Sequence, residues 1–169
     1  MTLDEALRNK DIPADIRKTL ELVVVPYFSF EEREETGYLV VHKDLVNDVR
    51  KIFATLAEQH FLIEKMIPVS AYGWDDDVSM EDNNSSAFNY RTIAGTERLS
   101  NHAFGRAVDI NPRLNPYVRG DYVAPRGATY DPRKPGTVTP EIADLFISRG
   151  WIWGGNWSDR KDWQHFEKP

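Results

Sequence analysis

One aspartate in an apolar setting most limits how this chain can fold. Asp109 lies between Val108 and Ile110, inside the segment Phe104–Asn111, whose alternating side chains predict a strand. A lone charge buried in such a strand is very costly in free energy, so the carboxylate has to be paired with a positive group or bound to a cation. The fold must therefore bring a cationic partner to this strand.

The histidines are the first candidates for a metal site that would supply this partner. The sequence contains four histidines and no cysteine, which excludes disulfides, thiolate metal sites and cysteine nucleophiles. His102 precedes Asp109 by seven residues, and His165 stands near the C-terminus. Two imidazoles and one carboxylate form a three-ligand zinc set, which leaves a fourth position for water in a catalytic site. The simpler alternative is a buried His102–Asp109 hydrogen bond, with His165 packed among aromatic residues.

A second carboxylate, Asp162, stands three residues before His165. It could act as the general base that accepts the proton of a zinc-bound water and passes it to the leaving amine. Residues i and i−3 of a regular strand face opposite sides, so Asp162 can share the site only if the strand begins after it. The polar residues 158–161 permit a turn there, and Asp162 as a plain turn residue is the alternative.

Size and charge exclude several classes of protein. The 169 residues suffice for one compact domain, and a hydrophobic fraction of 41% indicates a globular chain. A formal charge of −6 argues against a general nucleic-acid binder, which needs a basic surface. The longest apolar stretch, Leu20–Phe30, is far shorter than the about 20 residues of a membrane-spanning helix. The N-terminal residues are polar and acidic, unlike a secretory signal.

Hydrophobic periodicity predicts short helices and strands that do not alternate regularly. We expect short helical segments within residues 2–21, a clear amphipathic helix over 44–59 and a helix over 140–148, with strands over 37–42, 65–72, 104–111, 151–153 and 163–166. Two turn-rich segments are expected to be loops, namely residues 73–87 and the proline-rich residues 112–140. This order favours an α+β fold with a small central antiparallel sheet and flanking helices.

The pattern SxHxxGxAxD, which starts at Ser100, is followed by an acid-x-x-His pattern that ends at His165. Together they resemble the zinc D-alanyl-D-alanine carboxypeptidase family, which includes VanY-like carboxypeptidases and L-alanyl-D-glutamate endopeptidases that cut peptidoglycan stem peptides. The similarity extends over Ser85–Arg91, Leu99–Pro116 and Gly150–Phe166. It implies a carboxypeptidase/hedgehog-like fold with a single zinc site, a zinc peptidase catalytic domain over 38–169 and a helical N-terminal extension over 1–37 packed on that domain.

The resemblance also implies a role for each site residue. By it, the zinc ligands are His102, Asp109 and His165, the catalytic base is Asp162, and the residues that contact substrate are Arg91, Ser100 and Trp163. Arg91 would hold the substrate carbonyl and stabilise the oxyanion. Family carboxypeptidases commonly carry Glu in an ExWH pattern, whereas here the acid is Asp162 and the tryptophan comes one position earlier. An aspartate base is closer to the endopeptidase branch.

Several of these residues also have simpler interpretations. Arg91 could be a surface ion-pair residue, and Ser100 could cap a turn. Glu167 could orient His165 or be a polar tail residue. The acidic run Asp75–Asp77 lacks the spacing of an EF-hand calcium loop and is expected to be a solvated loop near the rim of the site.

The two remaining histidines and the tryptophans have similar alternatives. His42 and His60 bracket the long helix and are expected to be exposed or capping residues. Four of the five tryptophans fall in the last nineteen residues, where they either pack in the core or line the cleft beside the metal.

We therefore expect a monomeric zinc metallopeptidase that hydrolyses peptide bonds in peptidoglycan stem peptides or muropeptides at the bacterial cell wall, in the periplasm or outside the cell. Cleavage of L-Ala-D-Glu is favoured on the aspartate base, and removal of terminal D-Ala is the alternative. A third possibility, of another class, is a non-catalytic zinc-containing module that recognises wall fragments.

Overall fold

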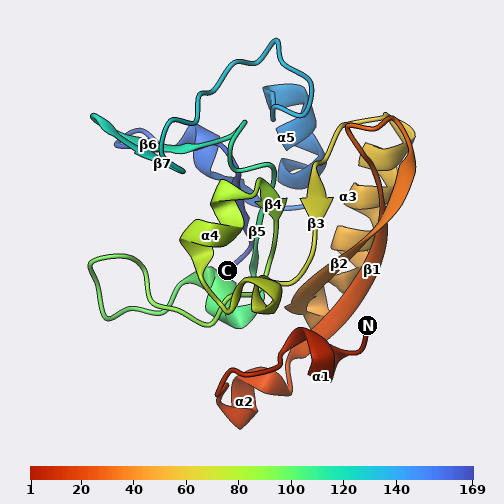
Figure 1. The fold of residues 1–169 in the computed structure, drawn as a ribbon, viewed down its shortest axis with the longest axis vertical. Coiled ribbons are helices and arrows are strands. Elements are labelled where there is room, and N and C mark those ends of the chain that lie inside the picture. The colour runs from red at the N-terminus through yellow and green to blue at the C-terminus, as the bar shows by residue number, and fades with distance from the viewer.

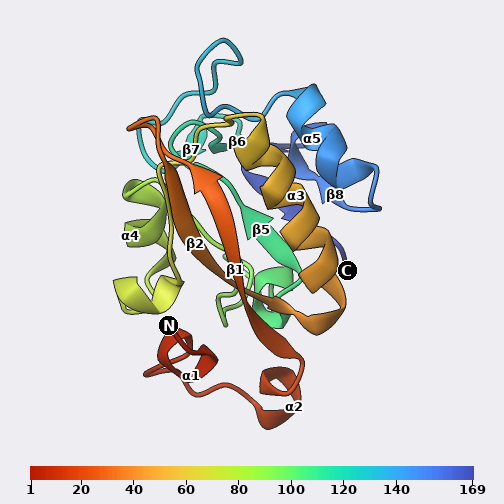
Figure 2. The same ribbon diagram turned by 90° about the vertical axis from the view of Figure 1, so that its right-hand side faces the viewer.

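The computed structural model describes residues 1–169, and its largest layer is a hairpin covered by a helix. Strands β1 (Leu20–Phe28) and β2 (Glu34–His42) pair antiparallel along nine residues each. Helix α3 (Val46–Glu58) follows a short 3-10 turn, η1 (Lys43–Leu45), and lies along the hairpin in both views (Figure 1, Figure 2). Its apolar positions all face inward, as the sequence periodicity predicts; the buried ones are Val46, Val49, Ile52, Phe53 and Leu56.

The N-terminal segment is less helical than expected. Helices α1 (Leu3–Ala6) and α2 (Ala14–Arg17) are single turns that pack at one end of the molecule with a small core of their own (Figure 1). From Leu20 onward the expectation of a helical extension is wrong, because the β-branched run Val23–Val25 forms part of β1. The expected boundary between residues 37 and 38 falls inside β2, which pairs with β1 along its whole length.

The small antiparallel sheet lies at the centre of the fold, as predicted. It contains β5 (Ala107–Asp109), β10 (His165–Glu167) and β8 (Ile152–Trp153), with β10 in the middle. The predicted strand over 104–111 is shorter than expected, because a 3-10 turn, η3 (Asn101–Phe104), occupies its start. Gly105 ends that turn with φ +66°, and a Cβ atom there would lie 2.6 Å from the backbone nitrogen of His42.

The segment between α3 and the central sheet holds more structure than its polar composition predicts. Only the first two residues of the expected strand 65–72 are extended, in β3 (Lys65–Met66), and Pro68 leads into a 3-10 turn, η2 (Val69–Tyr72). The expected loop 73–87 contains helix α4 (Asp76–Glu81) and strand β4 (Asn84–Ser85), which pairs parallel with β3. The cap at Asp75 explains the helix, because its side chain accepts a hydrogen bond from the backbone of Val78.

The proline-rich segment forms a hairpin on the side of the molecule away from β1 and β2 (Figure 1). Strands β6 (Tyr117–Arg119) and β7 (Tyr122–Ala124) pair with each other, and β6 also pairs with β9 (Lys161–Asp162). Helix α5 (Pro140–Ile147) follows, as predicted, and Gly150 adopts φ +82° just beyond it.

One apolar core joins the hairpin, α3, α5 and the central sheet. It contains 22 buried residues. Phe166 of β10 stacks on Phe146 of α5 with ring centroids 3.8 Å apart, so β10 presents alternate side chains to the core and to the polar cluster around His165. A 3-10 turn, η4 (Gly154–Asn156), follows β8. None of the helices is both long and apolar enough to cross a membrane.

Candidate active site

The three predicted metal ligands lie together. Asp109 of β5 and His165 of β10 are directly opposite each other in the antiparallel register, and Nδ1 of His165 is 2.9 Å from Oδ1 of Asp109. Nε2 of His102 is 3.1 Å from Oδ2 of Asp109 and 3.2 Å from Nδ1 of His165. All three residues are buried, and one atom from each lies within 4.8 Å of the others. This group could hold a metal ion.

Local backbone features fix the position of each ligand. Asp109 is paired on both edges, since its backbone exchanges hydrogen bonds with Ser86 on one side and its strand pairs with β10 on the other. His102 sits in the tight turn η3, whose first residue position is capped by Ser100: the Ser100 hydroxyl accepts a hydrogen bond from the His102 backbone nitrogen. The capping interpretation of Ser100 is therefore the one that the structure supports.

In each imidazole, the ring nitrogen that faces away from the shared centre is also hydrogen-bonded. Nδ1 of His102 is hydrogen-bonded to the carbonyl of Ala87, and Nε2 of His165 is 3.0 Å from Oε2 of Glu167. Asn101 donates to the same Glu167 oxygen at 2.7 Å. With these outer nitrogens occupied, Nε2 of His102 and Nδ1 of His165 point to the shared centre, as metal-ligating histidines commonly do. The contact is the one that the orienting role considered for Glu167 requires.

The charges around this centre favour an additional cation. Burial acts against charge on Asp109, but the charges and hydrogen bonds of the two histidines outweigh it and hold the pKa of its carboxyl well below the usual range. Burial would lower the pKa of His165, yet hydrogen bonds to Asp109 and Glu167 raise that pKa to about 10. Without a metal, a proton on His165 therefore balances the two carboxylates, and a bound metal ion would take over that role.

Asp162 reaches the site because the chain turns between it and His165. Asp162 ends β9, residues 163 and 164 form a turn, and His165 begins β10, so the strand-parity objection does not apply. Oδ1 of Asp162 is buried and has no hydrogen-bond partner in the protein. Burial, together with the charge of Asp109, raises the pKa of Asp162 to about 7, against the opposing charges of His165 and Arg91. Such a carboxyl can take up and release a proton near neutral pH.

Arg91 lies close enough to the site to lower the pKa of Asp162. Its Nη2 atom is 2.7 Å from Oδ2 of Asp76, the first residue of α4. Its Nε atom is buried and has no hydrogen-bond partner in the protein. The expected acidic loop is thus a helix start in which Asp75 caps the backbone, Asp76 binds Arg91 and Asp77 is exposed.

The aromatic residues near the site differ from the expectation in one respect. Trp163 is half-buried and stacks on Tyr130 with ring centroids 3.8 Å apart, so one face of its ring is covered. Trp157 is the tryptophan whose ring lies beside a ligand, 5.5 Å from that of His165, and the Arg160 guanidinium covers it at 4.4 Å. Nothing in the sequence distinguishes Trp157 from the other C-terminal tryptophans.

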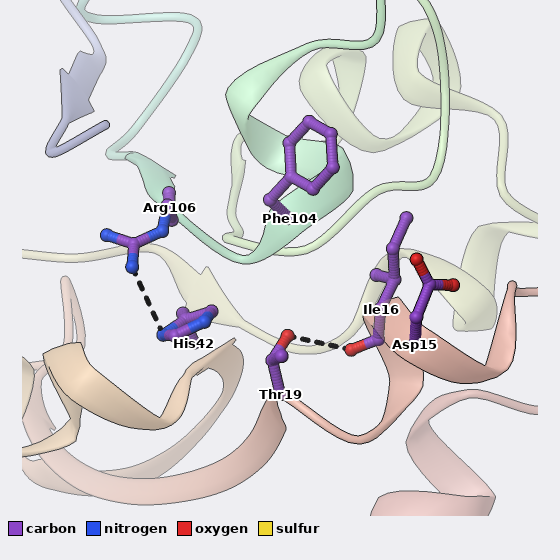
Figure 3. Close-up of a pocket in the computed structure, with 6 residues that line it drawn as sticks. All are labelled: Asp15, Ile16, Thr19, His42, Phe104 and Arg106. Carbon is purple, nitrogen blue, oxygen red and sulfur yellow. Dashed lines mark hydrogen bonds between the residues drawn. The ribbon is translucent and has the colours of Figure 1, made fainter.

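A cavity of about 230 Å³ lies away from the ligand atoms, between α2, the end of β2 and the exit of η3 (Figure 3). His42 lines it, 3.5 Å from Nη2 of Arg106, and accepts a hydrogen bond from the backbone of Asp44, as the capping interpretation predicts. His60 is exposed and stacks on Phe28. Neither histidine joins the metal-ligating group.

Comparison with protein families gives one match. The family model described as D-alanyl-D-alanine carboxypeptidase matches residues 94–168. Residues 94–168 are thus similar to this family. The matched segment contains the three predicted ligands, Ser100, Asp162 and Trp163, whereas Arg91 lies just before it. The match supports a peptidoglycan-related metallopeptidase. Comparison with curated proteins and with solved structures gives no significant match.

Proposed function

We propose that the protein is a zinc-dependent peptidase that hydrolyses peptide bonds in peptidoglycan stem peptides at the bacterial cell wall, and that it acts as a monomer. The observation that carries this proposal is the convergence of two imidazole nitrogens and a carboxylate beside a buried, unpartnered carboxylate, Asp162. A binding module has no need of a base with a pKa near neutrality at this position, whereas hydrolysis of a peptide bond does.

The donor set fits zinc. Zinc sites with catalytic activity combine imidazole nitrogens and carboxylate oxygens from three residues and leave one position open. The outer hydrogen bonds that the two rings form to the Ala87 carbonyl and the Glu167 carboxylate already set the ring orientations that such ligation requires. A zinc ion held by His102, Asp109 and His165 would polarise the scissile carbonyl and acidify a water molecule.

Asp162 is the group that moves the proton. In its ionised form, the Asp162 carboxylate accepts the proton of the attacking water and then returns that proton to the departing amine. The buried setting supports both steps, because it raises the pKa of Asp162 to about 7 and so makes proton gain and loss similarly accessible near neutral pH.

Arg91 provides the cationic group for the substrate carbonyl. Its side chain is partly exposed and forms a single ion pair, to Asp76, so guanidinium N–H groups remain to donate to that oxygen. A fixed donor that meets the developing negative charge stabilises the transition state more than the ground state. Ser100 acts indirectly, by capping the turn that carries His102.

The scissile bond has two candidates. The aspartate base favours L-Ala-D-Glu endopeptidase activity, whereas the description of the matching family favours removal of terminal D-Ala. Zinc-loaded protein incubated with purified muropeptides, followed by mass spectrometry of the products, separates the two because the released fragments differ in mass.

The same assay tests the function itself. Asp162→Asn should lower turnover by about 10²–10⁴-fold while zinc content stays at one ion per chain. Asp159→Asn is the matched control, since this exposed residue lies just before β9 and pairs only with Arg160. No cleavage by the zinc-loaded protein, with unchanged fragment binding by Asp162→Asn, would instead favour a recognition module.

A further inference from the structure

Arg91 depends on a single charged side chain for its position. Asp76 provides its only ion pair, 2.7 Å from Nη2, and the one other hydrogen bond of its guanidinium is a long 3.4 Å contact to the carbonyl of Thr92. An arginine side chain has many rotamers, and a donor helps catalysis only when it is already in place. The Asp76 carboxylate is therefore what distinguishes one orientation of this guanidinium from the others.

Asp76 is itself tied to the metal-ligand turn through Asn89. The Asn89 side chain donates from Nδ2 to Oδ1 of Asp76 at 3.1 Å, while its backbone nitrogen donates to the carbonyl of His102 at 3.2 Å. Asn89 is only 2% exposed. Its amide nitrogen must face Asp76, because an ionised carboxylate only accepts hydrogen bonds. One residue thus connects the partner of Arg91 to the backbone of a metal ligand.

We propose that Asp76, held by Asn89, is a positioning residue that fixes the Arg91 guanidinium relative to the metal ligands, so that its remaining exposed N–H groups face the substrate carbonyl. This inference rests on the proposed function. The pair holds Nη2 while the Arg91 side chain stays 32% exposed, so part of the guanidinium is still accessible to a substrate. The alternative is a purely structural tie between α4 and the segment that precedes the ligand turn.

The neighbouring aspartate offers a matched control. Asp76→Ala should lower kcat/KM for the cleaved muropeptide about tenfold, with zinc content and melting temperature close to those of the native protein. Asp77→Ala, one residue along in the same helical turn, should stay within about twofold because Asp77 is exposed and forms no ion pair. Asp76→Asn, which keeps the side-chain volume, should fall between the two and repeats the test if the alanine variant is unstable.

A double-mutant cycle separates positioning from a structural role. In an Arg91→Met background, Asp76→Ala should cause no further loss beyond about twofold, because its effect passes through the arginine. An equal loss in both backgrounds would overturn the inference. Full activity of Arg91→Met, with Asp162→Asn inactive, would also overturn it while leaving the peptidase function intact.

A measurement without substrate distinguishes failure of the positioning inference from failure of the proposed peptidase function. The Nε–H signal of Arg91 in nitrogen-15 NMR should be sharp and slow to exchange in the native protein and in Asp77→Ala, and should broaden or exchange rapidly in Asp76→Ala. Identical signals in all three proteins would overturn the inference. The NMR comparison needs no cleavage assay. Identical signals would therefore count against the positioning inference even if the protein is not a peptidase.

Discussion

The two sides of the site are held by different kinds of contact. On the ligand side, which comprises His102, Asp109 and His165, paired strands and a glycine-terminated turn set each position through the backbone. On the arginine side, which comprises Arg91 and Asp76, the alignment rests on side-chain contacts between α4 and an extended segment. The ligand side should therefore tolerate little change without losing the metal, whereas the arginine side should lose rate first.

Removing a ligand is the harshest test of this comparison. His102→Ala should reduce bound zinc from one ion per chain to near zero and lower muropeptide cleavage by at least about a thousandfold, since a two-ligand site holds zinc poorly. His60→Ala should match the native protein in both respects, because His60 is exposed and distant from the ligand group. Metal analysis and turnover, measured on the same samples, check both; a variant that lacks zinc but keeps activity would contradict the metal-dependent mechanism.

A smaller change targets the support behind a ligand. Glu167→Gln keeps the size of the side chain but weakens the hydrogen bond to Nε2 of His165, so zinc affinity should fall by about 10–100-fold. Competition with a chelator of known affinity measures this change. Glu141→Gln serves as a control, being exposed and located in α5. At saturating zinc the activity of Glu167→Gln should recover, and failure to recover would assign Glu167 a role beyond ligand orientation.

Substitution of Gly154, which contacts Asp162, should cause a moderate loss of activity. A Cβ atom at Gly154 would lie 2.6 Å from the carbonyl oxygen and 2.8 Å from the Cβ of Asp162. Gly154→Ala should therefore shift β9, lower kcat by about tenfold and cost about 1–3 kcal/mol of stability, while the zinc site stays intact. Single-turnover kinetics and metal analysis distinguish this outcome from general unfolding. Loss of zinc in this variant would mean that the base and the ligands are not separately positioned.

The grouping of the ligand side could be predicted from the sequence because the types and positions of its residues indicate which side chains must interact. A carboxylate between Val108 and Ile110 needs a cationic or hydrogen-bonding partner, and the two histidines are the residues that the sequence offers for it. Asp162 was predictable for the same reason, although the turn that brings it into the site was only permitted by the sequence. The supporting carbonyl of Ala87 was not predictable, because every residue has a carbonyl and only tertiary packing selects one.

The arrangement of the arginine side could not be predicted from the sequence. Three adjacent aspartates, Asp75–Asp77, have the same chemistry, and their division into cap, arginine partner and exposed residue depends on where α4 begins. The same segment was expected to be a loop, since its polar composition conceals a capped helix. Strand β1 was likewise missed, because the run Val23–Val25 becomes recognisable as a strand only when β2 pairs with it.

The last expected effect concerns stability in the absence of metal, and it leaves the activity of the zinc-loaded protein unchanged. The pKa of His165 is raised from 6.5 to about 10, so the folded metal-free protein binds a proton that the unfolded chain releases in this range. The resulting stabilisation is complete below pH 6.5 and is lost as the pH rises toward 10. Chelated protein should therefore lose on the order of 3 kcal/mol of unfolding free energy between pH 7 and pH 9.5.

Zinc should remove most of this dependence, because the zinc-bound folded protein carries no proton on His165 and the unfolded chain has released its proton above pH 7. Urea unfolding of chelated and zinc-saturated samples over the same pH range measures both slopes. Parallel slopes would mean that His165 is not the residue exchanging a proton for the metal, and the ligand side would then need a different charge balance from the one that its hydrogen bonds to Asp109 and Glu167 indicate.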